Sequence, residues 1–71
     1  MEKVKIETEM IQLDQFLKWA SILQSGGEIR FLLDEQRIFV NGELCSAKRK
    51  KLHAGDIVEI KGIGTYELVG A

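Results

Sequence analysis

The strongest chemical signal in the sequence is a run of four basic residues, Lys48-Arg49-Lys50-Lys51. Adjacent cations can bind a polyanion such as nucleic acid, but such a run can also be a solvated loop that keeps a protein soluble. The whole chain has ten Lys and Arg against eleven Asp and Glu, a net charge of −1. Residues 37–53 nevertheless hold five basic residues and one acidic residue, a local charge of +4. An anionic partner is therefore compatible with the acidic overall balance, because nearby charges set the local field.

Three further basic residues could extend this charge into a surface. Lys18 and Arg30 project from two predicted helices, and Arg37 directly follows the second helix. If the helices stack against a sheet, these residues could join the Lys48–Lys51 run; otherwise they are unrelated solvated charges. Trp19 lies beside the apolar stripe of the first predicted helix, and Phe31 lies off the stripe of the second. Each aromatic ring is either an edge of the core or a stacking surface for an unpaired base.

The residues offer little for catalysis or metal binding. His53 is the one imidazole and is expected in an exposed turn beside the basic run, a poor position for a catalytic base. Cys45 is the one cysteine, so it cannot form an intramolecular disulfide, and we expect it to be a small buried apolar residue. Together they are too few for a structural zinc site. The sequence predicts no enzyme activity, no metal and no cofactor. Gly26-Gly27 precedes a helix, so its amides could bind one phosphate, or the pair could simply form a turn.

The apolar pattern of the first half predicts one strand and two helices. The alternation around Val4-Lys5-Ile6 indicates a strand over residues 3–8. The apolar residues then recur at helical spacing over residues 12–23, with Lys18 facing outward. Ser25 and Glu28 have the spacing of a capping box, which predicts a second helix over residues 27–35. The two helices should form a helical hairpin.

From Arg37 onward the period of the apolar pattern changes to two. Ile38-Phe39-Val40 leads into Asn41-Gly42, a strong hairpin-turn signal, because both turn residues tolerate positive φ. Leu52 is a candidate core residue, and further strands are expected over residues 57–60 and 65–69. The order of elements predicts an α+β domain, in which an N-terminal strand and a helical hairpin pack on a small, mostly antiparallel sheet.

The length and composition limit the class of protein. Seventy-one residues form one small domain, expected to span residues 1–71 and to be monomeric. The apolar runs are too short for a spanning helix, and the N-terminus alternates charged and apolar residues, unlike a signal peptide. A cytoplasmic protein with no membrane contact is the expectation.

An ordered set of residues resembles the RNA-binding domain of small-subunit ribosomal protein "S-four". The resemblance covers about residues 8–60 and is carried by short segments in a characteristic order: Leu13-Asp14-Gln15-Phe16-Leu17, Ser25, Arg30, Leu32-Leu33, Ile38-Phe39-Val40-Asn41-Gly42, Leu52 and Gly55-Asp56-Ile57-Val58. The short length resembles most closely the free-standing bacterial YaaA/YbcJ-like members. The resemblance implies a non-catalytic alpha-L motif that binds structured RNA, in particular ribosomal RNA, mainly through its phosphates. It also implies a role in ribosome assembly or function, with ribosomal proteins as further candidate partners.

The chain departs from the family pattern at three positions. The arginine usual after the serine is Gly26, the arginine that often starts the first helix is Gln12, and the glycine usual before the third segment is Gln36. The first two departures remove expected phosphate contacts. The expected RNA-binding residues are therefore Lys18, Arg30, Arg37, Lys48, Arg49, Lys50 and Lys51, with base stacking on Trp19 or Phe31.

Two other classes of protein remain open from the sequence. Val40-Asn41-Gly42-Glu43 and the segment 55–60 also resemble ubiquitin-like sulfur carriers, although the chain ends Val69-Gly70-Ala71 rather than in the Gly-Gly carboxylate their chemistry needs. A protein-docking module that uses Trp19 and Phe31 is the other alternative.

Overall fold

A computed structural model describes residues 1–70, in which two helices and seven short strands alternate along the chain. The elements are β1 (Glu2–Lys5), β2 (Met10–Gln12), α1 (Leu13–Trp19), α2 (Gly26–Asp34), β3 (Ile38–Val40), β4 (Glu43–Leu44), β5 (Lys51–His53), β6 (Ile57–Ile60) and β7 (Gly64–Val69). The radius of gyration is 10.8 Å.

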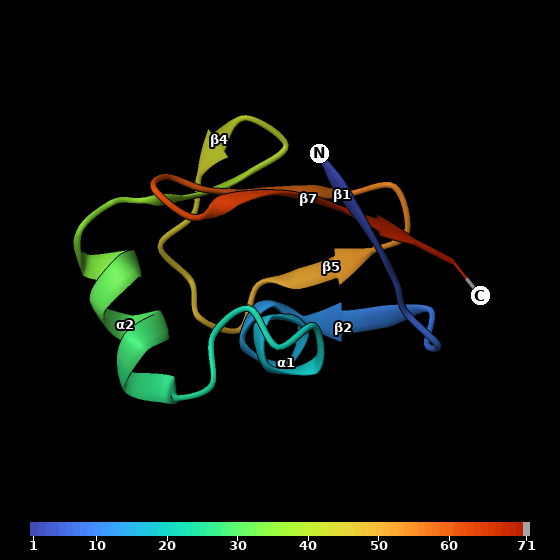
Figure 1. Ribbon diagram of the computed structural model, residues 1–71, viewed down its shortest axis with the longest axis horizontal. Helices are drawn as coiled ribbons and strands as arrows, with labels where there is room; N and C mark the ends of the chain where they lie inside the picture. The colour runs from blue at the N-terminus through green and yellow to red at the C-terminus, as the bar shows by residue number, and fades with distance from the viewer. Residues whose placement is uncertain (71) are drawn as a thin grey trace.

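The strands form two sheets of unequal size. The larger sheet has the order β1-β7-β6-β3-β4, in which β1 runs parallel to β7 and the other neighbours are antiparallel. The smaller sheet is an antiparallel ribbon of β2 and β5. Figure 1 shows α1 and the β2–β5 ribbon beneath the larger sheet, with α2 at one end. The predicted α+β class with a mostly antiparallel sheet is confirmed.

One apolar core lies between the helices and the sheet. Each helix contributes one apolar stripe, from Leu13, Phe16 and Leu17 of α1 and from Ile29, Leu32 and Leu33 of α2. The strands contribute every second residue, because side chains alternate between the two faces of a strand. These inward residues include Ile38, Val40, Leu52, Val58, Ile60 and Leu68. The periodicities read from the sequence therefore identified the core faces correctly.

The helix boundaries differ from the prediction at one end. The first helix was expected to continue to residue 23, but α1 ends at Trp19. Ser21 has φ 58°, a left-handed conformation that a helix cannot contain, and the N–H groups of Ile22 and Leu23 both donate to the Leu17 carbonyl. Leu23 is still buried, so it joins the core from a turn and not from the helix. The Ser25 cap is confirmed, since its Oγ accepts the Glu28 N–H at 3.2 Å.

The strand expected over residues 3–8 was only partly right. The extended segment ends at Lys5, and a separate strand, β2, begins at Met10. Its partner β5 contains Lys51, which the sequence had placed in the basic run, and His53, which was expected in a turn. The β2–β5 ribbon is the one structural element between residues 1 and 70 that the sequence did not indicate.

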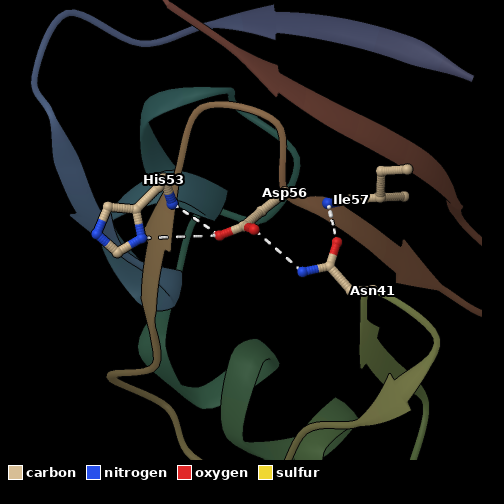
Figure 2. Close-up of polar contacts among 4 residues, drawn as sticks. All are labelled: Asn41, His53, Asp56 and Ile57. Carbon is tan, nitrogen blue, oxygen red and sulfur yellow. Dashed lines mark hydrogen bonds and ion pairs between the residues drawn. The ribbon is translucent and has the colours of Figure 1, made fainter.

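A polar network ties the turn after β3 to the turn before β6 (Figure 2). Asn41, with φ 52°, donates from Nδ2 to Asp56 Oδ1 at 3.0 Å and accepts the Ile57 N–H at 2.9 Å. Asp56 Oδ2 accepts the His53 N–H at 2.8 Å. Burial raises the pKa of the Asp56 carboxyl, but the hydrogen bonds from Asn41 and His53 and the charges of His53 and Lys50 lower this pKa further, to below its ordinary value. The ionised carboxylate therefore stabilises the fold.

Replacing Asp56 should cost stability in a pH-dependent way. We expect Asp56→Ala to lower the free energy of unfolding at pH 7 by about 1.5–3 kcal/mol, because hydrogen bonds to a charged group are lost. The folded pKa lies below the unfolded value of about 3.9, so the carboxylate contributes stability above that pH. The difference between wild type and variant should shrink as the pH falls through the folded pKa, as measured by urea unfolding at several pH values.

Asp34→Ala is the matched control, because Asp34 is an exposed carboxylate whose ion pair with Arg30 spans 3.7 Å. Such a pair contributes little to stability in water. An Asp56→Ala effect no larger than that of Asp34→Ala, or one independent of pH, would contradict the role given to the network.

Candidate nucleic-acid interface

The four consecutive cations Lys48–Lys51, here called the basic loop, are anchored to the start of α1 by backbone hydrogen bonds. The Leu13 N–H donates to the Lys50 carbonyl at 2.8 Å, and the Asp14 N–H donates to the Lys48 carbonyl at 3.1 Å. The first amides of a helix have no partner within it, so the basic loop supplies two of them with acceptors. The four side chains are half-buried at Lys48 and exposed at the other three positions. The backbone is thus held while the charges face solvent.

Lys48 connects the basic loop to the start of α2. Its Nζ lies 3.1 Å from the point where a Cβ on Gly26 would stand. Arg30 follows Gly26 by four residues and lies on the same side of α2, one turn further along. Arg30 is exposed, and its Nε lies 3.7 Å from Asp34 Oδ1. Lys48 and Arg30 therefore belong to one cationic row along α2.

Lys51 connects the basic loop to the β2–β5 ribbon. Lys51 pairs with Gln12, and His53 pairs with Met10, so these four side chains share one face of the ribbon. Leu52 on the opposite face is fully buried. Met10 borders a groove that Lys18 also lines. Lys48 thus lies beside the start of α2, Lys51 lies on the ribbon, and Lys18 lies at a groove that the ribbon borders.

Arg37 is occupied by contacts in the turn between β6 and β7. Its guanidinium donates from Nε at 3.1 Å and from Nη2 at 2.7 Å to the Lys61 carbonyl in the turn between β6 and β7. The same guanidinium fills the space beside Gly62, which has φ 87°. Lys61 in turn places its Nζ 5.1 Å from the centre of the Phe39 ring. Arg37 therefore fastens a turn, a structural task that the sequence did not suggest.

The two candidate stacking residues lie in different surroundings. Trp19 is 53% exposed, and its indole N–H donates to the Lys5 carbonyl at 3.1 Å. Phe31 is 58% exposed and borders a shallow apolar hollow with Leu23 and Ile63, in which Glu28 is the one charged lining residue. Both rings are more exposed than core residues, and only Trp19 has a cation, Lys18, beside it in a groove.

The remaining reactive side chains form no assembled reaction site in residues 1–70. Cys45 is buried, as expected, and its Sγ lies 3.5 Å from the Ala47 carbonyl oxygen. His53 is exposed, and its Nδ1 lies 4.0 Å from Asp56 Oδ2. No group of three or more His, Cys, Asp and Glu side chains in the described residues could hold a metal ion. Within the same residues, neither helix has the length and apolar character needed to cross a membrane.

The fold and the anchored cations agree with a known class of protein. Two helices on a mostly antiparallel sheet are the arrangement expected of an alpha-L RNA-binding fold. The sequence model of the S4 domain family matches residues 4–69, so the chain belongs to this family of RNA-binding domains. This is the S-four-type domain expected from the ordered motifs.

A full-length relative supports the same assignment. The chain is 46% identical over 66 residues to a protein of Bacillus subtilis (strain 168) named probable ribosome maturation protein RlbA. The match covers 93% of this chain and 93% of that protein. The expected likeness to the short YaaA-like members is therefore confirmed. The sulfur-carrier alternative depends on the C-terminal end of the chain, where Ala71 lies outside the described residues.

The structural task of Arg37 can be tested with two glycines of similar conformation. Gly62 and Gly42 have φ 87° and 83°, but a Cβ on Gly62 would meet the Arg37 guanidinium, whereas a Cβ on Gly42 would meet nothing within 4 Å. Both Gly→Ala variants should lose about 1–2 kcal/mol through backbone strain. We expect Gly62→Ala to lose roughly 1 kcal/mol more, because the hydrogen bonds of Arg37 to Lys61 are broken.

Urea unfolding in two backgrounds isolates the contact. In an Arg37→Ala background the extra cost of Gly62→Ala should disappear, since the partner is already gone. If the extra cost persists without Arg37, the guanidinium does not act through the space beside Gly62.

Proposed function

We propose that this domain is a non-catalytic RNA-binding protein that holds structured ribosomal RNA through phosphate contacts and acts in ribosome maturation. Residues 1–71 would work as one domain. The observation that carries the proposal is the anchoring of the basic loop at the start of α1, with Lys48 reaching the start of α2. Charges contributed by distant parts of the chain thereby meet where a polyanion can lie.

The electrostatics favour a polyanionic partner over solvent alone. Four consecutive like charges on an anchored backbone cannot separate freely, so their mutual repulsion is relieved when phosphates bind and counterions are released. Arg30 and Lys18 would extend the surface beyond the basic loop. Arg37 would be a peripheral contact, because two of its N–H groups are already occupied at Lys61. Trp19 and Phe31 are the candidates for contact with an unpaired base.

Membership of the S4 domain family supports RNA as the polyanion. The name of the Bacillus subtilis relative, probable ribosome maturation protein, supports a ribosomal RNA target and a role in maturation. The absence of catalysis in the proposal follows from chemistry: the exposed His53 and the buried Cys45 have no partner arrangement for acid–base or nucleophilic work in residues 1–70. A cytoplasmic location and possible contacts with ribosomal proteins would accompany this role.

Salt dependence and removal of the basic loop test the proposal. About four or five phosphate contacts, at a slope of about −0.7 each, predict a slope of log K against log salt near −3 in filter binding. Changing Lys48, Arg49, Lys50 and Lys51 together to Ala should weaken binding to all RNAs similarly and flatten this slope. Binding that does not depend on salt would contradict the proposal.

A pair of charge reversals separates the local surface from net charge. Lys50→Glu and Lys3→Glu change the net charge equally at exposed positions, but Lys3 lies on the edge strand β1 and not in the basic loop. We expect Lys50→Glu to reduce RNA affinity by roughly tenfold, about 1.4 kcal/mol, and Lys3→Glu by less than about twofold. Equal effects would show that binding follows net charge alone.

A further inference from the structure

An open groove beside Trp19 has no structural task in the fold. It has a volume of about 530 Å³ and is lined by Thr8, Met10, Ile11, Gln15, Lys18 and Trp19. This volume lies within the range of about 300–1,000 Å³ common for small-ligand sites. Met10 is 41% exposed and Trp19 is 53% exposed, so two large apolar side chains face solvent at the groove.

The Trp19 ring is held in place rather than loosely exposed. Its Nε1–H donates to the Lys5 carbonyl at 3.1 Å, which joins the end of α1 to the end of β1. This hydrogen bond satisfies the polar edge of the indole and leaves the face of the ring available for stacking. An anchored aromatic ring loses little conformational entropy when a planar group stacks on it.

The polar residues of the groove fit a nucleobase attached to a phosphate. Gln15 Oε1 accepts the Gln12 N–H at 3.3 Å, and its amide nitrogen has no hydrogen-bond partner among residues 1–70, so that it can donate to a base edge. Lys18 supplies a cation for the adjoining phosphate. Glu7 lines a smaller hollow that Trp19 also borders, so an RNA strand would approach from the Lys18 side.

Met10 connects the groove to the ribbon that carries Lys51. It lies on the same face of the β2–β5 ribbon as Lys51, and its pair with His53 is two residue pairs along from the Gln12–Lys51 pair. A strand whose phosphates lie on the basic loop could therefore place an adjacent unpaired base in the groove. The hollow at Phe31 lacks this combination, because its one charged lining residue is the acidic Glu28.

We propose that the groove between Trp19 and β2 is a subsite for a single unpaired RNA base, which stacks on Trp19, receives a hydrogen bond from Gln15 and has its phosphate held by Lys18. This inference rests on the proposed RNA-binding function and adds the recognition of unpaired nucleotides to it. Base stacking on an aromatic side chain tolerates different bases, because each base has a π face.

The chain has one tryptophan, so its intrinsic fluorescence reports on this subsite directly. The probes are a short oligouridine strand, an oligoadenosine strand and a fully paired RNA duplex of the same length. We expect the single strands to quench Trp19 fluorescence with saturation, and the duplex to bind with little quenching. In filter binding, which needs no tryptophan, Trp19→Leu should weaken single-strand binding by about 5- to 150-fold, the range for loss of one stacked base, and leave duplex binding nearly unchanged.

Two further variants keep the test decisive. Phe31→Leu removes the other candidate ring, which has comparable exposure, and tests the competing position; we expect it to weaken single-strand binding by less than Trp19→Leu does. Trp19→Phe loses the hydrogen bond to Lys5 but keeps a stacking ring, so it should retain most of the single-strand affinity if stacking is the cause. Circular dichroism and thermal unfolding establish that each variant is folded.

The outcomes separate this subsite from the general function. Salt-dependent RNA binding that is insensitive to Trp19→Leu, or weakened equally for strand and duplex, overturns the base subsite while the proposed function stands. Failure of all three RNAs to bind the wild-type protein overturns both. A loss of affinity with Phe31→Leu and not with Trp19→Leu would assign stacking to the other ring and also overturn the subsite.

Discussion

The cationic surface depends on two backbone hydrogen bonds, from the Leu13 and Asp14 N–H groups to the Lys50 and Lys48 carbonyls. Through these bonds, helix α1 gains acceptors for two amides that have no partner within the helix. The same bonds fix the path of a loop that carries four cations. Without them, mutual repulsion would favour an extended and solvated run, and Lys48 would not be held near Gly26. The basic loop, which the sequence shows only as a run of charge, is therefore held in place because it caps the start of α1.

The rest of the molecule positions this anchored loop with few interactions. A domain of 71 residues has a small core and a thin margin of stability, so polar contacts between turns matter more than in a larger protein. Asn41 and Asp56 join two turns that lie 15 residues apart, and Arg37 fastens the turn at Lys61. Both contacts join turns of the larger sheet, which shares one apolar core with the helices (Figure 1). Among the basic residues, Arg37 therefore stabilises the fold, whereas Arg49, Lys50 and Lys51 face solvent.

Sequence reasoning reached the α+β class, both helices and their buried stripes, because these features repeat at fixed spacings over several turns or strands. The family was reached separately, through the resemblance of an ordered set of motifs. It missed the β2–β5 ribbon, since strands of three residues are too short to show a period, and two of the residues in β5 are polar. It extended α1 by four residues because Leu23 keeps helical spacing although the chain has already turned at Ser21. Among the cations, it could not distinguish Arg37 from Arg30, because a hydrogen bond to a carbonyl 24 residues away leaves no local signal.

The sequence by itself determined which residues are apolar, that the chain turns at Asn41-Gly42 and how much positive charge residues 37–53 carry, since these are properties of composition and local spacing. The tertiary structure alone decided the neighbours of each cation. It placed Lys48 at the start of α2, put Lys51 on the same ribbon face as Met10, which borders the groove of Lys18, and bound Arg37 to the Lys61 carbonyl. The physical reason is that a side chain's neighbours depend on the packing of elements distant in sequence, and that packing is set by core burial and backbone hydrogen bonds rather than by the charges themselves.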